Sequence, residues 1–132
     1  WIENQKQEAY EIQGTKKNSE AVIQECLRYI HNHLEDTELS VNQLADQCHM
    51  NAIYLNRIFR KEKETSIGQY IIQERMHLAA RLLLDSGLTA HTVAEKVGYL
   101  NYPYFSTAFK KFYGCSPQKY VERQEDSHEN KD

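Results

Sequence analysis

Turn-forming residues are scarce in this chain, and their scarcity narrows the choice of fold. The 132 residues include five glycines and two prolines. A small all-β domain needs many tight turns, and most tight turns use these residues. No apolar run approaches the roughly 18 residues that a membrane-spanning helix needs. The first 20 residues also lack the apolar segment of a signal peptide. These absences favour a helical fold and predict no association with a membrane.

A cysteine pairing pattern is also missing. The chain has an odd number of cysteines, which are Cys26, Cys48 and Cys115. Because nothing in their spacing suggests disulfides, we expect reduced thiols and a cytoplasmic protein.

Catalytic and metal-binding motifs are missing as well. His31 and His33 lie two residues apart, so on a helix their rings point in different directions. Cys48 and His49 are adjacent and have no second ligand pair at zinc spacing. The sequence contains no phosphate-binding loop, no nucleophile motif and no pair of carboxylates with catalytic spacing. We therefore expect a protein without enzymatic activity, metal or cofactor.

Positive charge, by contrast, is concentrated in one part of the chain. The formal net charge is −3, but residues 51–121 carry 10 basic and 5 acidic side chains. Residues 1–50 carry 4 basic and 9 acidic side chains, and residues 122–132 carry 2 and 5. The local field decides attraction to nucleic acid more than the total does. A charge run alone is more often a solvated face, so this pattern needs support from other signals.

One segment of the sequence occurs twice, at a spacing of 50 residues. NAIYLNRIFRKEKETSIGQYI begins at Asn51, and NYPYFSTAFKKFYGCSPQKYV begins at Asn101. Nine positions are identical or alike, and the aromatic and basic residues stay in step. Chance similarity between two amphipathic helices would not preserve that order, so the chain contains one supersecondary unit twice.

The pattern of each copy predicts a short helix, a turn and a longer helix. In the first copy, Ser40 and Gln43 form a capping-box pattern before the short helix, and Asn51 caps the longer one. His49 occupies the turn, where its backbone would be left-handed, a conformation that His tolerates better than most residues. The first helix-turn-helix is expected at about residues 40–62.

In the second copy, the short helix starts after Thr89 or after His91-Thr92. Gly98 lies in its turn, where a glycine adopts positive φ without steric cost. Asn101 caps the longer helix, and Pro103 falls in the first turn, where its missing N–H is harmless. The second helix-turn-helix is expected at about residues 90–113.

Between the copies, a long helical pattern is expected at about residues 66–85. At 1.5 Å per residue its length is roughly 30 Å, close to the roughly 34 Å between successive major grooves on one side of B-DNA. A plain core helix would have the same length. Arg75 and Arg81 are expected on its polar side. An earlier amphipathic helix over residues 20–34 would pack on the first copy.

The motifs of both copies resemble those of the AraC/XylS family of transcription regulators. VAEKVGYLNYPYFSTAFKKFYGCSPQKYV is similar to the family signature, and LNRIFRKE and RMHLAARLLL match the first half. The resemblance covers about residues 20–123 and implies an all-α domain of about seven helices that binds promoter DNA. Ala90 is smaller than the apolar residue usual in the family, so looser packing is expected there. Residues 1–18 would be a linker from an upstream domain, 19–123 the DNA-binding domain, and 124–132 an acidic tail.

DNA contacts are expected near the start of the longer helix in each copy, because such helices enter the major groove by their N-terminal residues. In the first copy, Asn56 and Arg57 have side chains suited to adenine and guanine. Ile53 can touch a thymine methyl but fits the core equally well. The candidates in the first copy are Asn51 at the start of the helix, Ala52, Ile53, Asn56 and Arg57 for bases, and Arg60 and Lys61 for phosphates.

The second copy offers less base-specific chemistry. Its candidate residues are Tyr102, Pro103, Ser106 and Thr107, with Lys110 and Lys111 for phosphates. Since the first four lack Arg, Asn and Gln side chains, this copy is expected to act through phosphates and DNA shape. Its aromatic residues Tyr104, Phe105 and Phe109 are expected in the core.

Two partners besides double-stranded promoter DNA follow from the resemblance: RNA polymerase, and an upstream receiver or signal-sensing domain in the full-length protein. The alternative to DNA binding is a helical protein–protein interaction module that uses the acidic residues 1–50.

Overall fold

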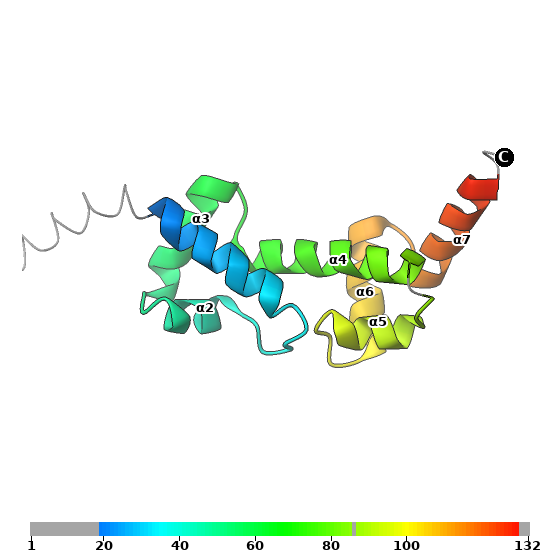
Figure 1. Ribbon diagram of the computed structural model, residues 1–132, viewed down its shortest axis with the longest axis horizontal. Helices are drawn as coiled ribbons and strands as arrows, with labels where there is room; N and C mark the ends of the chain where they lie inside the picture. The colour runs from blue at the N-terminus through cyan, green and yellow to red at the C-terminus, as the bar shows by residue number, and fades with distance from the viewer. Residues whose placement is uncertain (1–18, 86, 130–132) are drawn as a thin grey trace, which may run out of the picture.

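The computed structural model describes residues 19–85 and 87–129 (Figure 1), so the predicted linker over residues 1–18 lies outside the described part. All regular structure in the described residues is helical, which confirms the all-α prediction of about seven helices. None of the helices described is long and apolar enough to cross a membrane. The first helix covers residues 19–32, and the others are α2 (Val41–Gln47), α3 (Ala52–Lys63), α4 (Ile67–Asp85), α5 (Ala90–Lys96), α6 (Tyr102–Tyr113) and α7 (Pro117–Glu129).

The helix starts are set by side-chain caps. In each cap a side-chain oxygen accepts a hydrogen bond from a backbone N–H two or three residues later, which satisfies a donor that the helix itself leaves free. At the start of α5, Thr89 is the cap, and this decides between the two predicted starts. The caps of this kind are Ser40, Asn51, Ser66, Thr89, Asn101 and Ser116.

The turns of the two copies match in backbone conformation. His49 has φ +54° and its counterpart Gly98 has φ +88°, so the predicted left-handed histidine is confirmed. The same pairing recurs at the ends of α3 and α6, where Glu64 has φ +61° and Gly114 has φ +81°. Both of these end residues donate their N–H to a carbonyl four residues earlier, at 2.8 Å.

The duplication extends beyond the helix-turn-helix into the following helix. Phe59 and Phe109 are both fully buried. Tyr70 on α4 lies edge-on to Phe59 at 5.4 Å between ring centroids, and Tyr120 on α7 lies edge-on to Phe109 at the same 5.4 Å. The start of α4 in the first copy therefore corresponds to α7 in the second.

Helix α4 runs from one group of helices to the other (Figure 1), and it belongs to two hydrophobic cores. Its N-terminal residues Ile67 and Ile71 join the core formed with the first helix, α2 and α3. Its later residues Met76, Ala79 and Leu83 join the core formed with α5, α6 and α7. We call these two halves the first and second subdomains. One continuous helix of 19 residues supplies part of each core.

One prediction about the polar side of α4 was wrong. Arg75 does not lie on the polar side of α4: it is 8% exposed and donates from Nη2 to the Asp36 carbonyl at 2.7 Å. Arg81 is exposed as predicted. Helix α7 continues through the acidic segment after Arg123 as far as Glu129.

Candidate nucleic-acid interface

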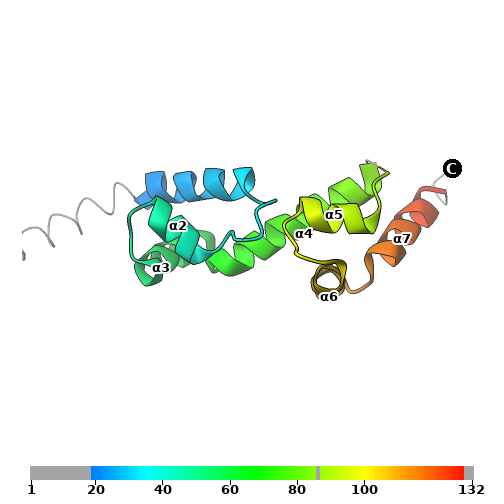
Figure 2. The same cartoon turned by 90° about the horizontal axis from the view of Figure 1, so that it is seen from below.

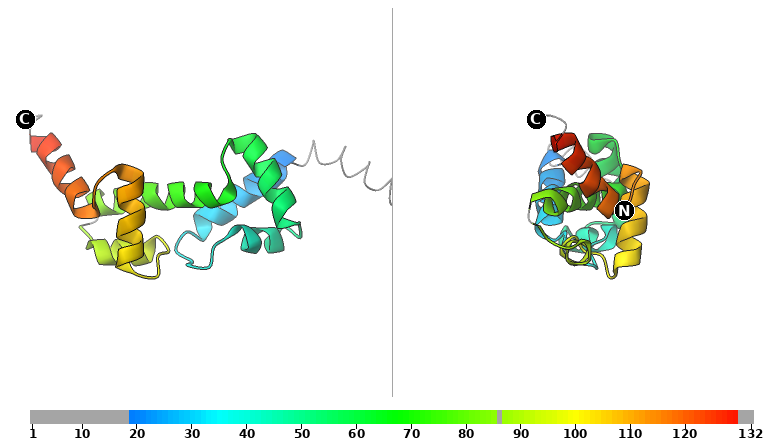
Figure 3. Two further views of the ribbon diagram at one scale, coloured as in Figure 1. Left: turned by 180° about the vertical axis from the view of Figure 1, so that it is seen from behind. Right: turned by 90° about the vertical axis from the view of Figure 1, so that its right-hand side faces the viewer.

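Helices α3 and α6 lie on the same side of the molecule. Seen from behind, α6 stands upright in front of α4, and α3 stands in front of the first helix, beyond the other end of α4 (Figure 3). Seen from below, both lie on the side opposite the first helix (Figure 2). Helix α4, of 19 residues, spaces them, and it is about 28 Å long at 1.5 Å per residue. The fold thus presents the second helix of each copy to one common side.

The start of α3 combines a cap with an exposed apolar residue. The Asn51 Oδ1 accepts hydrogen bonds from the N–H groups of Ile53 and Tyr54, at 2.9 and 3.2 Å. Asn51 therefore positions the helix rather than offering its oxygen to a base. Ile53 is 73% exposed, so of its two predicted positions it takes the one on the surface and not the one in the core. Ala52 is half-buried against the first core.

Arg57 lies one helical turn after Ile53, so both residues share a face of α3. Its side chain is exposed, and the next turn adds the exposed Arg60 and Lys61. Within the residues that the structure describes, none of these three cations forms an ion pair, since the ion pair found there joins His31 to Glu74. Basic residues near a helix C-terminus also stabilise the helix dipole, but these remain free to bind an anion.

Asn56 has a different role from the predicted one. Its Oδ1 accepts a hydrogen bond from the backbone N–H of Ile67 at 2.9 Å, and the side chain is half-buried. Ile67 is the first residue of α4, so Asn56 ties the end of the first unit to the start of the long helix. We leave Asn56 out of the proposed base-reading face for this reason.

The exposed face of α6 is made of short and basic side chains. Pro103, Thr107, Lys110 and Lys111 are exposed. Ser106 is half-buried, and Tyr102 is half-buried because its ring stacks on His91 with centroids 4.3 Å apart. Tyr102 therefore contributes to the second core more than to the surface.

Tyr104 corrects the prediction that three aromatic residues of α6 are buried. Phe105 and Phe109 are fully buried as predicted, but Tyr104 is 65% exposed. The spacing of these residues predicts the difference. Phe105 and Phe109 are four residues apart and share one face, whereas Tyr104 lies about 100° from Phe105 around the helix. Leu100, 76% exposed just before the helix cap, is a second residue that sequence reasoning missed.

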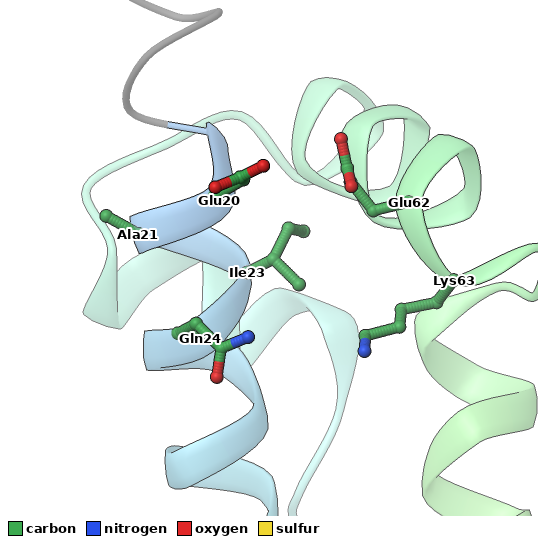
Figure 4. Close-up of a pocket in the computed structure, with 6 residues that line it drawn as sticks. All are labelled: Glu20, Ala21, Ile23, Gln24, Glu62 and Lys63. Carbon is green, nitrogen blue, oxygen red and sulfur yellow. The ribbon is translucent and has the colours of Figure 1, made fainter.

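Two surface grooves flank the subdomains. The first, of about 430 Å³, lies between the first helix and the end of α3, and Figure 4 shows Ile23 on the floor between Glu20 and Glu62. The second, of about 580 Å³, lies between α4, α5 and α7 beside Ala90. Its position agrees with the looser packing expected at Ala90. Neither lining brings together a nucleophile and a base.

Two of the cysteines and two of the histidines have structural partners instead of a reactive site. The thiols of Cys26 and Cys48 are free and lie 4.0 Å apart. Burial raises the pKa of Cys26 to about 12, so this thiol stays protonated and unreactive at neutral pH. His31 and His33 have different partners, Glu74 and the Tyr29 carbonyl. In the described part of the chain, no three acidic, histidine or cysteine side chains gather to hold a metal ion.

Comparisons with known proteins agree with this geometry. A family model described as a helix-turn-helix domain matches residues 44–123. The Msm operon regulatory protein of Streptococcus mutans is 31% identical over 109 residues, which cover 83% of this chain and 39% of that protein. The chain spans between 13% and 39% of the length of three curated relatives that it matches.

Solved structures give the same result. The C-terminal domain of AraT, a response regulator from Geobacillus stearothermophilus, aligns with a TM-score of 0.76 and 35% identity, covering 77% of this chain and 84% of that one. The DNA-binding domain of AdpA, solved in complex with a target DNA, aligns with a TM-score of 0.72 and 26% identity over 76% of this chain and 90% of that one. The chain belongs to the AraC/XylS family of transcription regulators, as a DNA-binding domain of the helix-turn-helix type.

Proposed function

We propose that the chain binds promoter DNA by placing α3 and α6 in two successive major grooves, and that it regulates bacterial transcription in this way. The observation that supports this most directly is the common side of the two helices, held by one continuous α4 (Figure 3). A spacer of about 28 Å is near the roughly 34 Å groove repeat of B-DNA. The protein would act in the cytoplasm, without catalysis of its own.

The two helices would divide the work. On α3, Arg57 has the fork of donors that suits guanine, and Ile53 offers an apolar surface to a thymine methyl. On α6, Thr107 and Pro103 carry little base-specific chemistry, so this helix would depend on phosphate contacts from Lys110 and Lys111 and on DNA shape. Base contacts from the first unit and backbone contacts from the second would together determine which operator sequence the chain binds.

Selection of bound duplexes from random DNA, with the wild-type chain and with Arg57→Ala, tests this division. We expect Arg57→Ala to relax base preference at one position and to cost about 1–3 kcal/mol of binding free energy. Arg81→Ala removes the same charge from the exposed side of α4 and serves as the control. An unchanged sequence preference would remove Arg57 from the base-reading face. Absence of DNA binding even at low salt would favour a protein-interaction module.

The phosphate role is tested separately with Lys111→Ala. The lysine is exposed on α6, and loss of one phosphate contact weakens binding to every sequence by a similar factor. The slope of log affinity against log salt should also fall by about 1. Titrations at several salt concentrations on two different duplexes measure both effects. A loss confined to one sequence would contradict a phosphate contact.

Two further partners belong to the full-length protein. RNA polymerase is the expected partner of a promoter-bound regulator. An upstream receiver or signal-sensing domain fits the relatives, since AraT is described as a response regulator and the curated relatives are longer than this chain.

A further inference from the structure

Arg75 is the charged residue that the described part of the chain buries. It lies in the middle of α4, between the residues that serve the first core and those that serve the second. Its Nη2 donates to the backbone carbonyl of Asp36 at 2.7 Å. Asp36 lies in the loop after the first helix, so Arg75 holds a segment of the first subdomain that is 39 residues away in sequence.

The same guanidinium also touches the second subdomain. Its central carbon lies 5.8 Å from the centroid of the Tyr99 ring, within the range of a cation–π contact. A Cβ placed on Gly98 would lie 2.9 Å from Arg75 Nη2 and would collide with the Leu34 carbonyl oxygen. The turn of the second unit is therefore packed directly on the loop of the first, with Arg75 between them.

This contact lies off the axis of α4, and from that position it can restrict the angle between the two subdomains. The extensive packing among the labelled helices runs within each subdomain or to α4 itself. A single helix can bend and allows the units at its two ends to change their angle. A second point of contact beside the helix removes that freedom. The Arg75 fork suits the task, because a guanidinium can donate to a carbonyl and stack on a ring at once.

Stability alone does not explain a buried arginine here. Burial lowers the pKa of Arg75, partly offset by Tyr99 and Asp36. Its Nε has no hydrogen-bond partner in the structure, and a buried polar group without a partner costs free energy. An apolar residue of similar volume would avoid that cost.

We propose that Arg75 is a positioning residue that fixes the angle between the two helix-turn-helix units and so determines which half-site spacing both can occupy. The inference rests on the proposed two-groove binding. Arg75 itself would not touch DNA.

The test uses the whole chain and duplexes built from its selected operator, with one half-site alone, with both at the selected spacing, and with the spacing changed by one or two base pairs. We expect Arg75→Met to bind the single half-site within about twofold of wild type and to lose roughly tenfold on the two-site duplex, because the second unit is no longer held in register. Its preference for the selected spacing should flatten. Arg81→Met, on the exposed side of the same helix, should leave all profiles unchanged.

A measurement without DNA separates this inference from the proposed function. Residual dipolar couplings of the free chain report the relative orientation of the two units. We expect one orientation in wild type and in Arg81→Met, and averaged couplings between the units in Arg75→Met, with each unit still folded. Tyr99→Leu removes the ring contact, and should give the same averaging if Arg75→Met does not fold. An unchanged spacing profile with unchanged couplings would overturn the proposal. If wild type binds no DNA, the proposed function fails while the couplings still test the positioning role.

Discussion

Glu64 ends α3 in a left-handed backbone conformation that its counterpart Gly114 adopts at the end of α6. For a residue with a Cβ this conformation costs roughly 1–2 kcal/mol, because the Cβ approaches the following carbonyl. Glycine has no such cost, which is why it dominates this position after helices. The first unit thus carries a local strain that the second does not.

We therefore expect Glu64→Gly to raise the free energy of unfolding by about 0.5–1 kcal/mol, net of the greater freedom of glycine in the unfolded chain. Urea unfolding followed by circular dichroism measures the change. Glu62→Gly, two residues earlier inside the helix, is the control and should lower stability by about 1 kcal/mol. A lower stability for Glu64→Gly would show that the left-handed glutamate is not strained.

Residues whose role depends on near neighbours were predictable from sequence, and residues whose role depends on distant ones were not. The caps Ser40 and Asn101 act within three residues, so their pattern is visible in the chain. Arg75 is buried by a loop and a turn that lie far from it in sequence. The hydrogen bond that Asn56 accepts from Ile67 reaches across the turn between two helices, so the sequence pattern did not reveal it.

At the scale of the element, α5 begins beside a groove. Ala90, its first residue, is half-buried, and the groove of about 580 Å³ extends from it towards Leu84 and Val121. Leu84 is 42% exposed. A larger apolar side chain at position 90 would cover part of this surface without displacing the buried core.

Ala90→Leu should therefore raise the free energy of unfolding by about 1 kcal/mol, from partial burial of the added carbons at about 0.8 kcal/mol for each fully buried methylene. Thermal unfolding of the chain provides the measurement. Ala90→Ser changes the same position without adding apolar area and should give no gain. Destabilisation by leucine would mean that the groove walls cannot accept it.

Helix extents were predictable where an apolar stripe or a cap marked them. The interval predicted for α4, about 66–85, differs little from the observed Ile67–Asp85. The end of α7 was not predicted, because the apolar stripe stops near Val121 while the helix runs on to Glu129. Glutamate, glutamine and arginine are good helix formers, so this segment can be helical without burying a face.

At the scale of the whole molecule, the two cores are separate but share α4. Phe59 fills the first and Phe109 the second, and each is fully buried. Large-to-small changes at such positions cost about 3–5 kcal/mol. Because the cores are distinct, the subdomain that carries the substitution should lose stability before the other one does.

Phe109→Ala should therefore lower amide protection in α5, α6 and α7 before it lowers protection in α2 and α3, and Phe59→Ala should do the reverse. Hydrogen exchange resolved by peptide mass spectrometry checks this order. The two variants are matched controls for each other. Equal loss throughout the chain in both would show that the subdomains unfold as one unit.

The sequence repeat predicted two copies. The structure adds that the two copies are not independent units, because they share α4. The missing information was that α4 serves two cores, since a helix pattern does not say which core each end of the helix joins. Likewise, the exposure of Ile53 depended on how the first copy turns its second helix outward.

The sharing of α4 sets a rule for cutting this protein into pieces. A fragment that keeps the whole first subdomain must run into α4 past Ile71, and one that keeps the second must begin in α4 before Met76. The Arg75 contact falls in the short interval between these limits. A single cleavage there would yield two halves. Each half would have a truncated α4, and neither would keep the contact of Arg75 with both subdomains. Independent fragments therefore have to overlap, each carrying its own copy of α4.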